Sequence, residues 1–430
     1  MAIALLVGAV ACGDDGAPVQ PDASTPTPDG PPDAPPVDLC QPKMLRSDLA
    51  WAGSNRADLM AWIASRGCDS AGYDPAHKPV ALFDWDNTIS KNDFGDAITF
   101  YMVKQGKILQ PPDQDWKQTS AYMTDEGAAA LTAACGTTVA AGEPLPTDTD
   151  TACADEILSM YIDNETTGGD VAFSGQDYRR MEPTYAWTAQ LMAGYTDAEV
   201  QEFATAAITP QLAAPENSVQ TVGSRTNLNG WLRIYEQSKD LIEVLKSQGY
   251  DVWIITASPQ PVIQAVAPMA GIAADHVVGI RSAKDANGKR TYGFEGCGSV
   301  PDGNQTLIPY IAGKRCWVNK VVYGDTTANA MLKRPDGQRQ AFAAGDSDTD
   351  VDFMRDATYR LTIDRNKAEL MCHSFYNAND TWRVNPMFIQ PKAKKTSAYP
   401  CSTTACKDEA GTAGPCRDDA GNIIPDQLEP

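Results

Sequence analysis

Two aspartates directly follow a short apolar segment of the chain. Val80-Ala-Leu-Phe83 is preceded by Pro79, is typical of a buried strand and runs into Asp84-Trp-Asp-Asn-Thr88. Carboxylates near a core are costly unless a cation or a proton offsets their charge. Asp84 and Asp86 therefore predict a cation or a proton at the end of this strand.

Polar clusters follow two further apolar segments. Val252–Ile255 ends in Thr256-Ala-Ser258, and Ala341–Ala344 ends in Gly345-Asp-Ser-Asp-Thr-Asp350. A fourth strand is predicted at Tyr359–Ile363, after a segment typical of a helix. Strands that alternate with helices predict a parallel sheet, and ligands bind at the carboxyl ends of such strands. The polar clusters lie at those ends.

The order of these motifs resembles that of the haloacid dehalogenase superfamily. The motifs are DxDxT at Asp84–Thr88, the strand-end Thr256, a lysine-bearing helix and GDxxxD at Gly345–Asp350. The resemblance covers roughly residues 78–390 and implies an α/β fold, in which a HAD-like Rossmannoid core with a parallel sheet carries an inserted, mostly helical cap. The second acid, Asp86, suits the phosphoserine phosphatase-like branch.

The resemblance also implies a role for each motif residue in phosphomonoester hydrolysis. Asp84 would be the nucleophile that forms an aspartyl-phosphate, and Asp86 would act as acid and then as base. Mg²⁺ would be held by Asp84, the backbone carbonyl of Asp86, and Asp346, with Asp350 as a direct ligand or as a holder behind it. Thr256 would hydrogen-bond to the phosphate oxygens.

A lysine that neutralises both the phosphate and the nucleophile completes this set. We prefer Lys314, at a predicted helix start, to Lys320. The polar segment Lys333–Arg339 is interpreted as a loop insertion that lengthens the path to the last motif. Asp348 has two interpretations, a metal-linked carboxylate or a charge on a solvated loop.

A long insertion separates the first two motifs, with 167 residues between Thr88 and Thr256. We predict a helical cap at residues 100–225 and a catalytic core at residues 40–99 and 226–390. Helices are predicted at Ala128–Ala134, at Tyr185–Met192, after the capping box Thr196-Asp-Ala-Glu199 and at Leu232–Lys246, with a loop at 143–151. Val277–Ser282 and Arg290–Phe294 predict a hairpin beside the core.

Aromatic and acidic residues of the predicted cap suit a quaternary ammonium group. For any single aromatic residue, a place in the cap's own core is the more common outcome. The residues are Tyr101, Trp116, Tyr122, Tyr161, Tyr178, Tyr185 and Trp187, together with Glu182.

A closer resemblance concerns the substrate. DxDNT, GDxDxD and the segments Leu361–Lys367 and Trp382–Ile389 are similar to a group of exported bacterial phosphatases that includes the phosphorylcholine phosphatases. The resemblance implies an Mg²⁺-dependent phosphomonoesterase for a small organic phosphate such as phosphocholine. One alternative is phosphoserine or another small anionic phosphomonoester, for which Arg179-Arg180 is the adjacent basic pair of the cap. Another is a non-catalytic, ligand-binding surface lipoprotein.

The N-terminal residues indicate export. Residues 2–11 form a short apolar segment directly before Cys12, which resembles a bacterial lipobox with lipid attached at Cys12. An ordinary secretory signal is the alternative. Residues 13–39 are rich in Pro and Asp and predict a disordered tether. We therefore expect residues 1–12 to be a lipoprotein signal, and the protein to be anchored by lipid to a membrane, in the periplasm or at the outer membrane or cell surface.

Eleven cysteines indicate an oxidising compartment. Without Cys12 ten remain, which allows five disulfides. Near neighbours predict Cys40–Cys68, Cys135–Cys153 and Cys297–Cys316. The last four cysteines, Cys372, Cys401, Cys406 and Cys416, would pair among themselves, and three of them lie in a C-terminal tail at 391–430.

Charge and composition exclude several classes of function. The formal net charge is −21, which repels a phosphate backbone and argues against a nucleic-acid partner. Apolar residues make up 43% of the chain, enough to build a core. No run of 18 or more apolar residues occurs, so we predict no spanning helix. The absence of an HExxH or CxxC pattern argues against a zinc site.

Overall fold

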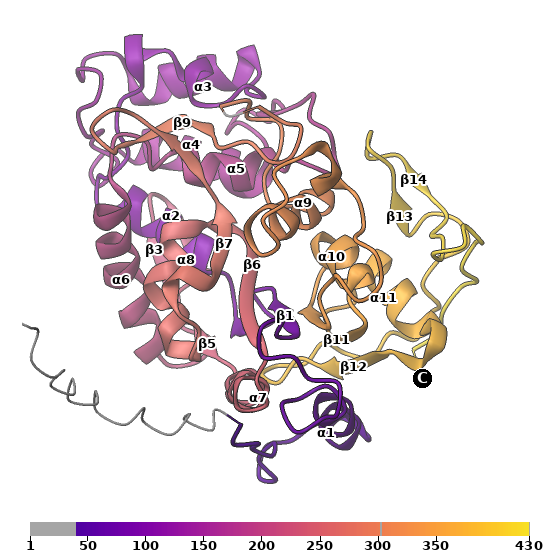
Figure 1. Cartoon of the computed structure of the whole chain (residues 1–430). Coiled ribbons are helices and arrows are strands. Elements are labelled where there is room, and N and C mark those ends of the chain that lie inside the picture. The colour runs from indigo at the N-terminus through magenta and orange to yellow at the C-terminus, as the bar shows by residue number, and fades with distance from the viewer. Residues whose placement is uncertain (1–39, 302, 430) are drawn as a thin grey trace, which may run out of the picture. The chain divides into compact units, whose positions relative to one another are not determined.

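The computed structural model describes residues 40–301 and 303–429 (Figure 1). The predicted signal, the lipid attachment site Cys12 and the tether at 13–39 lie outside the described residues. Contacts group residues 39–430 into one compact unit. The boundaries predicted between core and cap therefore remain predictions.

A six-stranded parallel sheet forms the centre of this unit, which confirms the predicted fold class. Its strand order is β12-β11-β10-β1-β6-β7, with Ala81 in register with Phe342 on one side and Val252 on the other. The strands are β1 (Val80–Phe83), β6 (Asp251–Pro259), β7 (Val277–Ile280), β10 (Phe342–Gly345), β11 (Tyr359–Asp364) and β12 (Trp382–Pro386).

Helices cover both faces of the sheet. Side chains of β1 alternate between two buried clusters, as the pleat requires. Ala81 and Phe83 share a cluster with α1, α7 and α8, whereas Val80 and Leu82 share one with α9, α10 and α11. Because both faces are buried, the sequence of β1 is continuously apolar. These helices are α1 (Asn55–Ala64), α7 (Glu236–Ser247), α8 (Gln260–Val266), α9 (Ala312–Val321), α10 (Val351–Asp356) and α11 (Ala368–Tyr376).

The insertion between β1 and β6 is mainly helical. It begins and ends at a two-stranded antiparallel pair, β2 (Ser90–Lys91) with β5 (Arg233–Ile234). Figure 1 shows α3, α4 and α5 grouped at the top of the view, above the central strands. The insertion contains α2 (Phe94–Lys104), α3 (Asp125–Cys135), α4 (Thr151–Asp163), α5 (Pro183–Gln190), α6 (Asp197–Ala213), β3 (Val219–Val222) and β4 (Arg225–Asn229).

The predicted helices of the insertion are present, and two helices were missed. Thr196 and Glu199 form the predicted capping box at the start of α6. The missed helices, α2 and α4, are preceded by the N-cap residues Asp93 and Asp150, whose carboxylates accept hydrogen bonds from the first turn. Those two N-cap aspartates were the available signal.

Two predictions beside the core were wrong in part. The helix predicted from Leu232 begins only at Glu236, because Arg233–Ile234 forms β5. Val277–Ile280 is not a hairpin strand but the edge strand β7, parallel to β6. The hairpin is shorter than predicted and pairs β8 (Ser282–Lys284) with β9 (Arg290–Phe294). A buried apolar run can join either kind of sheet, so the sequence pattern does not distinguish them.

Single turns of 3-10 helix connect several of these elements. They are η1 (Pro112–Gln114), η2 (Trp116–Thr119), η3 (Ala267–Ala270), η4 (Ala274–His276), η5 (Ala328–Met331), η6 (Asp348–Asp350) and η7 (Ala378–Asp380). Among the described residues, no helix combines the length and the apolar character that crossing a bilayer requires.

Five disulfides cross-link the described residues, and they include the three predicted pairs. The last four cysteines pair as Cys372–Cys401 and Cys406–Cys416. The C-terminal tail beyond Ile389 carries β13 (Cys406–Lys407) and β14 (Ala413–Gly414). Its Tyr399, Cys401 and Ile424 pack against α11 in a buried cluster. The predicted pairs are Cys40–Cys68, Cys135–Cys153 and Cys297–Cys316.

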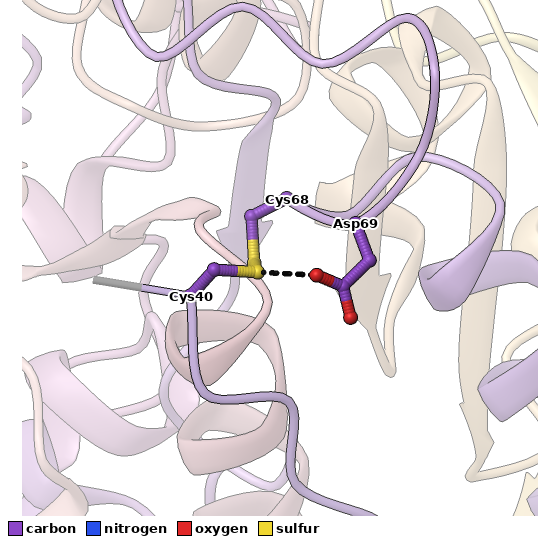
Figure 2. A group of neighbouring side chains, drawn as sticks. All are labelled: Cys40, Cys68 and Asp69. Carbon is purple, nitrogen blue, oxygen red and sulfur yellow. Dashed lines mark hydrogen bonds between the residues drawn. A yellow bond between two sulfur atoms is a disulfide. The ribbon is translucent and has the colours of Figure 1, made fainter. Parts of the chain in front are cut away.

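The first disulfide lies beside an acidic residue without forming a metal site. Figure 2 shows Cys40 and Cys68 with the carboxylate of Asp69, one oxygen of which lies 3.0 Å from the Cys40 sulfur. Because both sulfurs are held in the disulfide, neither is the thiolate that a metal binds. The same reason removes Cys406 from a metal site with its neighbours Glu369 and His373.

Candidate active site

Asp84 lies directly after β1 and is 6% exposed. Its backbone N–H donates to the carbonyl of Ala344 in β10 at 2.9 Å, which continues the strand pairing by one residue. This pairing fixes the backbone from which the carboxylate projects. The parallel sheet therefore places Asp84 at the edge where ligands bind in open α/β folds.

Lys314 is fully buried on α9 and joins two carboxylates. Its Nζ donates to Asp84 Oδ1 at 2.7 Å and to Asp350 Oδ1 at 2.6 Å. Burial alone would lower the pKa of Lys314, but the adjoining Asp350 and Asp84 carboxylates outweigh burial and raise that pKa. Lys314 thus keeps its positive charge and lies against Asp84, the candidate nucleophile.

Lys320, the alternative lysine, lies six residues further along α9 and contacts a different region. Its Nζ donates to the backbone carbonyl of Gly296 and lies 4.7 Å from the ring centre of Trp317. Residues six apart on an α-helix point in different directions. The structure brings Lys314, rather than Lys320, to Asp84.

Asp86 follows Asp84 by two residues and has different partners. Its Oδ1 accepts from the Phe94 backbone N–H at 2.8 Å, and its Oδ2 from Ser258 Oγ at 2.7 Å. Burial, and then the charge of Asp93, raise the pKa of Asp86 well above its usual range. A carboxyl group with a raised pKa can hold a proton near neutral pH, as a general acid must. Ser258, for which the sequence predicted no role, holds Asp86 in place.

Asp350 uses both carboxylate oxygens to hold the loop that follows β10. Oδ2 accepts from the backbone N–H groups of Asp346 at 2.9 Å and Ser347 at 3.0 Å, while Oδ1 accepts from Lys314. These contacts favour the holder interpretation over direct ligation. Asp348 also has a structural role. Its Oδ1 accepts from the Leu370 backbone N–H at 2.9 Å, near the start of α11.

Two residues without a predicted role complete the surroundings of Asp346. Thr88, the last residue of the first motif, donates from Oγ1 to Asp346 Oδ1 at 2.8 Å. An Arg365 N–H donates to Asp346 Oδ2 at 2.6 Å. Arg365 directly follows β11, whose carboxyl end shares an edge with β10. A basic residue at a strand end was the signal that could have identified it.

A cluster of three carboxylates fits a divalent cation, with Asp84 and Asp346 best placed to bind it because both Asp350 oxygens accept hydrogen bonds from other groups. Oxygens of Asp84, Asp346 and Asp350 all lie within 4.8 Å of one another, and all three residues are buried. Burial and then the charge of Asp350 raise the pKa of Asp84 despite Lys314. Burial also raises the pKa of Asp346, although Arg365 opposes it. A bound cation would stabilise the ionised carboxylates of Asp84 and Asp346 and so lower their pKa values. Oxygen ligands are those that Mg²⁺ prefers. The residues present therefore fit the predicted cofactor.

A cavity of about 560 Å³ opens onto these acids. The sheet side supplies Asp84, Asp86, Thr256, Ser258, Asp346, Arg365 and Lys367. The insertion side supplies three tyrosines and two acids together with neutral residues: Asp93, Gly95, Asp96, Phe100, Tyr161, Ile162, Tyr178, Thr184, Tyr185, Thr188 and, from the β3–β4 hairpin, Asn227, Leu228 and Asn229. A ligand in this cavity would have the motif residues at one end and the insertion at the other.

The insertion wall carries a buried acidic pair. Asp93 caps α2, and Asp96 lies one turn further along the same helix. Tyr161 of α4 donates its hydroxyl to Asp96 Oδ1 at 2.6 Å. Burial, followed by the charge of Asp93, raises the pKa of Asp96 to about 7. This carboxyl therefore changes charge near neutral pH.

Three of the aromatic residues proposed for the cap line the cavity: Tyr161, Tyr178 and Tyr185. They are joined by Tyr310, which lies outside the predicted cap and was missed. The other predicted residues pack elsewhere, with Trp116, Trp187, Tyr101 and Tyr122 in or against the main buried cluster and Glu182 capping α5. Which of these aromatic residues line the cavity depends on helix phase for Tyr161 and Tyr185 and on loop packing for Tyr178 and Tyr310, neither of which composition reveals.

Residues 169–355 match the family model of the haloacid dehalogenase-like hydrolases. The matched segment contains Thr256, Lys314, Asp346 and Asp350 and leaves out Asp84 and Asp86. No curated protein matches the chain.

Solved structures add a likeness of fold. A conserved protein of unknown function from Anaerococcus prevotii DSM 20548 is 20% identical, covers 80% of this chain and 94% of its own, and has a TM-score of 0.56. A protein of unknown function from Bordetella pertussis Tohama I is 14% identical, covers 71% and 97%, and scores 0.41. A substrate-bound phosphoserine phosphatase is 11% identical, covers 67% and 86%, and scores 0.31.

Proposed function

We propose that this protein is an Mg²⁺-dependent phosphomonoesterase of the haloacid dehalogenase type, with Asp84 as nucleophile. The observation that carries the proposal is the buried Lys314, whose ammonium group contacts Asp84 and Asp350 at one end of a cavity that Asp86 also lines. A charge-neutralised carboxylate beside a second, proton-bearing carboxyl is what transfer of a phosphoryl group to an aspartate requires. The family match over residues 169–355 supports it.

In the first step an Asp84 oxygen attacks the phosphorus of the ester. The bond between phosphorus and the alcohol oxygen breaks, and Asp86 gives its proton to that oxygen, so the alcohol leaves neutral. Lys314 holds the Asp84 carboxylate and offsets the phosphate's negative charge. Ser258 and the Phe94 N–H orient Asp86 throughout.

In the second step water hydrolyses the aspartyl-phosphate. Asp86, now ionised, takes a proton from the water as its oxygen attacks phosphorus, and the bond to Asp84 breaks to release inorganic phosphate. Thr256, 1% exposed on β6, accepts from the Ser258 N–H at 3.1 Å, which leaves its own hydroxyl proton free to donate to a phosphate oxygen. Mg²⁺ bound by Asp84 and Asp346 would supply positive charge to the phosphate in both steps.

Phosphate release from p-nitrophenyl phosphate tests the reaction. We expect release with Mg²⁺, none after chelation, and none from Asp84→Asn. Asp348→Asn is the control, because Asp348 is an aspartate of the last motif whose carboxylate accepts from the Leu370 N–H near the start of α11. If the wild type releases no phosphate from any phosphomonoester with Mg²⁺, the alternative of a non-catalytic binding protein replaces the proposal.

For the substrate we propose a phosphate ester with a cationic organic group, such as phosphocholine. Tyrosines and the acids Asp93 and Asp96 line the insertion side of the cavity, and aromatic rings together with carboxyls suit a quaternary ammonium. Arg179, considered for an anionic substrate, is engaged elsewhere by Asp352 and Glu369. Arg365 and Lys367 line the sheet side and keep phosphoserine as the second candidate.

A panel of phosphocholine, phosphoethanolamine and phosphoserine separates these substrates. We expect the highest kcat/KM for phosphocholine and a selective loss of that preference in Asp96→Asn. Equal values for all three esters would rule out recognition of the ammonium group, and a preference for phosphoserine would select the second candidate.

We also propose that the protein is exported and anchored by lipid at Cys12. The five disulfides among the described residues support an oxidising compartment. Expression in a bacterium, followed by membrane fractionation and mass spectrometry of the N-terminal peptide, tests this. Cys12→Ser should move the protein to the soluble fraction, and an unmodified Cys12 would select the ordinary secretory signal.

A further inference from the structure

The C-terminal tail contains two similar short sequences. Cys406-Lys-Asp-Glu-Ala-Gly-Thr412 and Cys416-Arg-Asp-Asp-Ala-Gly-Asn422 are ten residues apart. In each copy the aspartate Oδ1 accepts two backbone N–H groups, those of Ala410 and Thr412 or of Ala420 and Asn422, at 3.0 and 2.8 Å. We call these copies the first turn (Asp408–Thr412) and the second turn (Asp418–Asn422).

The first turn lies against Tyr178, a residue that lines the cavity. The Tyr178 backbone N–H donates to the carbonyl of Glu409 at 2.8 Å. Lys407 Nζ lies 4.8 Å from the ring centre of Tyr178. A Cβ atom added to Gly411 would lie 3.4 Å from the same ring. The tail thus contacts both the backbone and the ring of Tyr178.

Arg179, the next residue, ties the same segment to the core. Its guanidinium donates to the carbonyl of Lys407 at 2.9 Å, to Glu369 at 3.0 Å and to Asp352 at 3.2 Å. The Arg179 side chain is 16% exposed, and charge-assisted bonds at such sites are stronger than those between neutral groups. The Arg179 side chain therefore joins the tail, α10 and α11 next to Tyr178 in the chain.

The second turn and the disulfides hold the tail in place. Asp419 pairs with Lys333 at 2.9 Å and with Arg355 at 2.8 Å. Cys406–Cys416 links the first residues of the two repeated sequences, and Cys372–Cys401 links the tail to α11. The first turn is consequently tethered on both sides of its contact with Tyr178.

We propose that the C-terminal tail positions Tyr178 as a wall of the substrate cavity and thereby helps to set which organic group the cavity accepts. This proposal rests on the phosphatase function proposed above. Tyr178 is a binding residue, and the first turn acts through it. The first turn contacts the cavity lining through Tyr178 on the insertion side, so we expect changes in this turn to affect substrate binding more than the chemical step.

The repeated sequence supplies a matched pair of variants. Gly411 and Gly421 both have positive φ, +77° and +85°, and asparagine tolerates that conformation better than other side chains do. In Gly411→Asn the added Cβ is in van der Waals contact with the Tyr178 ring, and we expect the side-chain atoms beyond it to crowd that ring. Gly421 has nothing within 4 Å of an added Cβ, so Gly421→Asn reproduces the backbone change alone.

Kinetics and hydrogen exchange on the full chain test the proposal together. For the best substrate of the panel we expect Gly411→Asn to raise KM at least fivefold with kcat within twofold, and Gly421→Asn to change neither. Combined with Tyr178→Ala, Gly411→Asn should add no further rise in KM, since it acts through that ring. Backbone exchange in residues 177–181 should be faster in Gly411→Asn than in Gly421→Asn.

Two results would overturn this inference. One is an equal KM for both glycine variants in an active enzyme, and the other is equal exchange at residues 177–181. Failure of the phosphatase function looks different: the wild type then releases no phosphate, while the exchange difference between the two variants persists.

Discussion

Arg365 donates a 2.6 Å charge-assisted hydrogen bond to Asp346, one of the two carboxylates best placed to hold a cation. Arg365 also lines the cavity, so its charge lies close to both the acid and the space that a phosphate would enter. A positive charge at this place weakens the binding of a cation and strengthens that of an anion. The Asp346–Arg365 pair therefore links the two binding events of the proposed reaction.

Arg365→Ala should shift these two events in opposite directions. We expect Mg²⁺ to bind about tenfold more tightly, which corresponds to about 1.4 kcal/mol, and KM for the phosphomonoester to rise. Titration calorimetry with Mg²⁺ and steady-state kinetics measure the two effects. Arg365→Lys, which keeps the charge, should retain most of the wild-type Mg²⁺ affinity. Weaker Mg²⁺ binding in Arg365→Ala would show instead that the arginine chiefly positions Asp346.

Lys314→Met should abolish activity and destabilise the fold. Its removal leaves Asp84 and Asp350 buried without their cation, and breaking such a buried pair costs about 3–5 kcal/mol. Denaturant unfolding and phosphate release measure the two losses. Lys320→Met is the control on the same helix and should keep kcat within twofold. Lys314→Arg retains the charge, so a folded but inactive protein would separate catalysis from stability.

Mg²⁺ should stabilise the folded protein, and this effect is measurable without substrate. A cation at one hundred times its dissociation constant adds about 2.7 kcal/mol to the free energy of unfolding. Thermal unfolding with and without Mg²⁺ should show a higher Tm with the ion. Asp346→Asn should remove that increment. Asp348→Asn should lower Tm in both conditions and preserve the increment, since the Asp348 carboxylate accepts from the Leu370 N–H near the start of α11; loss of the increment there would make Asp348 a metal-linked residue.

The raised pKa of Asp96, about 7, predicts how the binding of a cationic substrate depends on pH. The protonated form is neutral and the ionised form attracts an ammonium group, so KM for phosphocholine should fall as pH rises from 6 to 8. p-Nitrophenyl phosphate, which shares the phosphate but lacks the ammonium group, controls for titration of the phosphate itself. Asp96→Asn should make the two pH profiles parallel, and parallel profiles in the wild type would contradict the assignment.

The raised pKa of Asp96 also affects the stability of the fold. As pH rises, its contribution to the free energy of unfolding falls, whereas the binding of a cationic substrate improves. Because the folded state holds the Asp96 proton more tightly than the unfolded chain, this group's contribution to stability is greatest below about pH 4 and is lost as pH rises through about 7. Asp96→Asn should therefore raise the free energy of unfolding at pH 8 relative to the wild type more than at pH 4. Urea unfolding at the two pH values measures this difference.

The sequence by itself determined the sheet and the meeting of its motifs. Continuous apolar segments such as Val80–Phe83 predicted strands buried on both faces, and a parallel sheet brings the carboxyl ends of such strands to one edge. Asp84, Thr256 and Asp346 could therefore be grouped without coordinates. Three disulfides also followed from the spacing of neighbouring cysteines.

Tertiary structure decided the contacts that depend on helix phase and on long-range packing. The start of α9 turns Lys314, rather than Lys320, toward Asp84. The packing of α4, α5 and two loops decides which tyrosines line the cavity. Arg365 meets Asp346 because β11 lies beside β10. Tyr178 meets Glu409, 231 positions away, because the tail is tethered to α11. Local sequence patterns carry no information about such pairs, since their formation depends on how the whole chain packs.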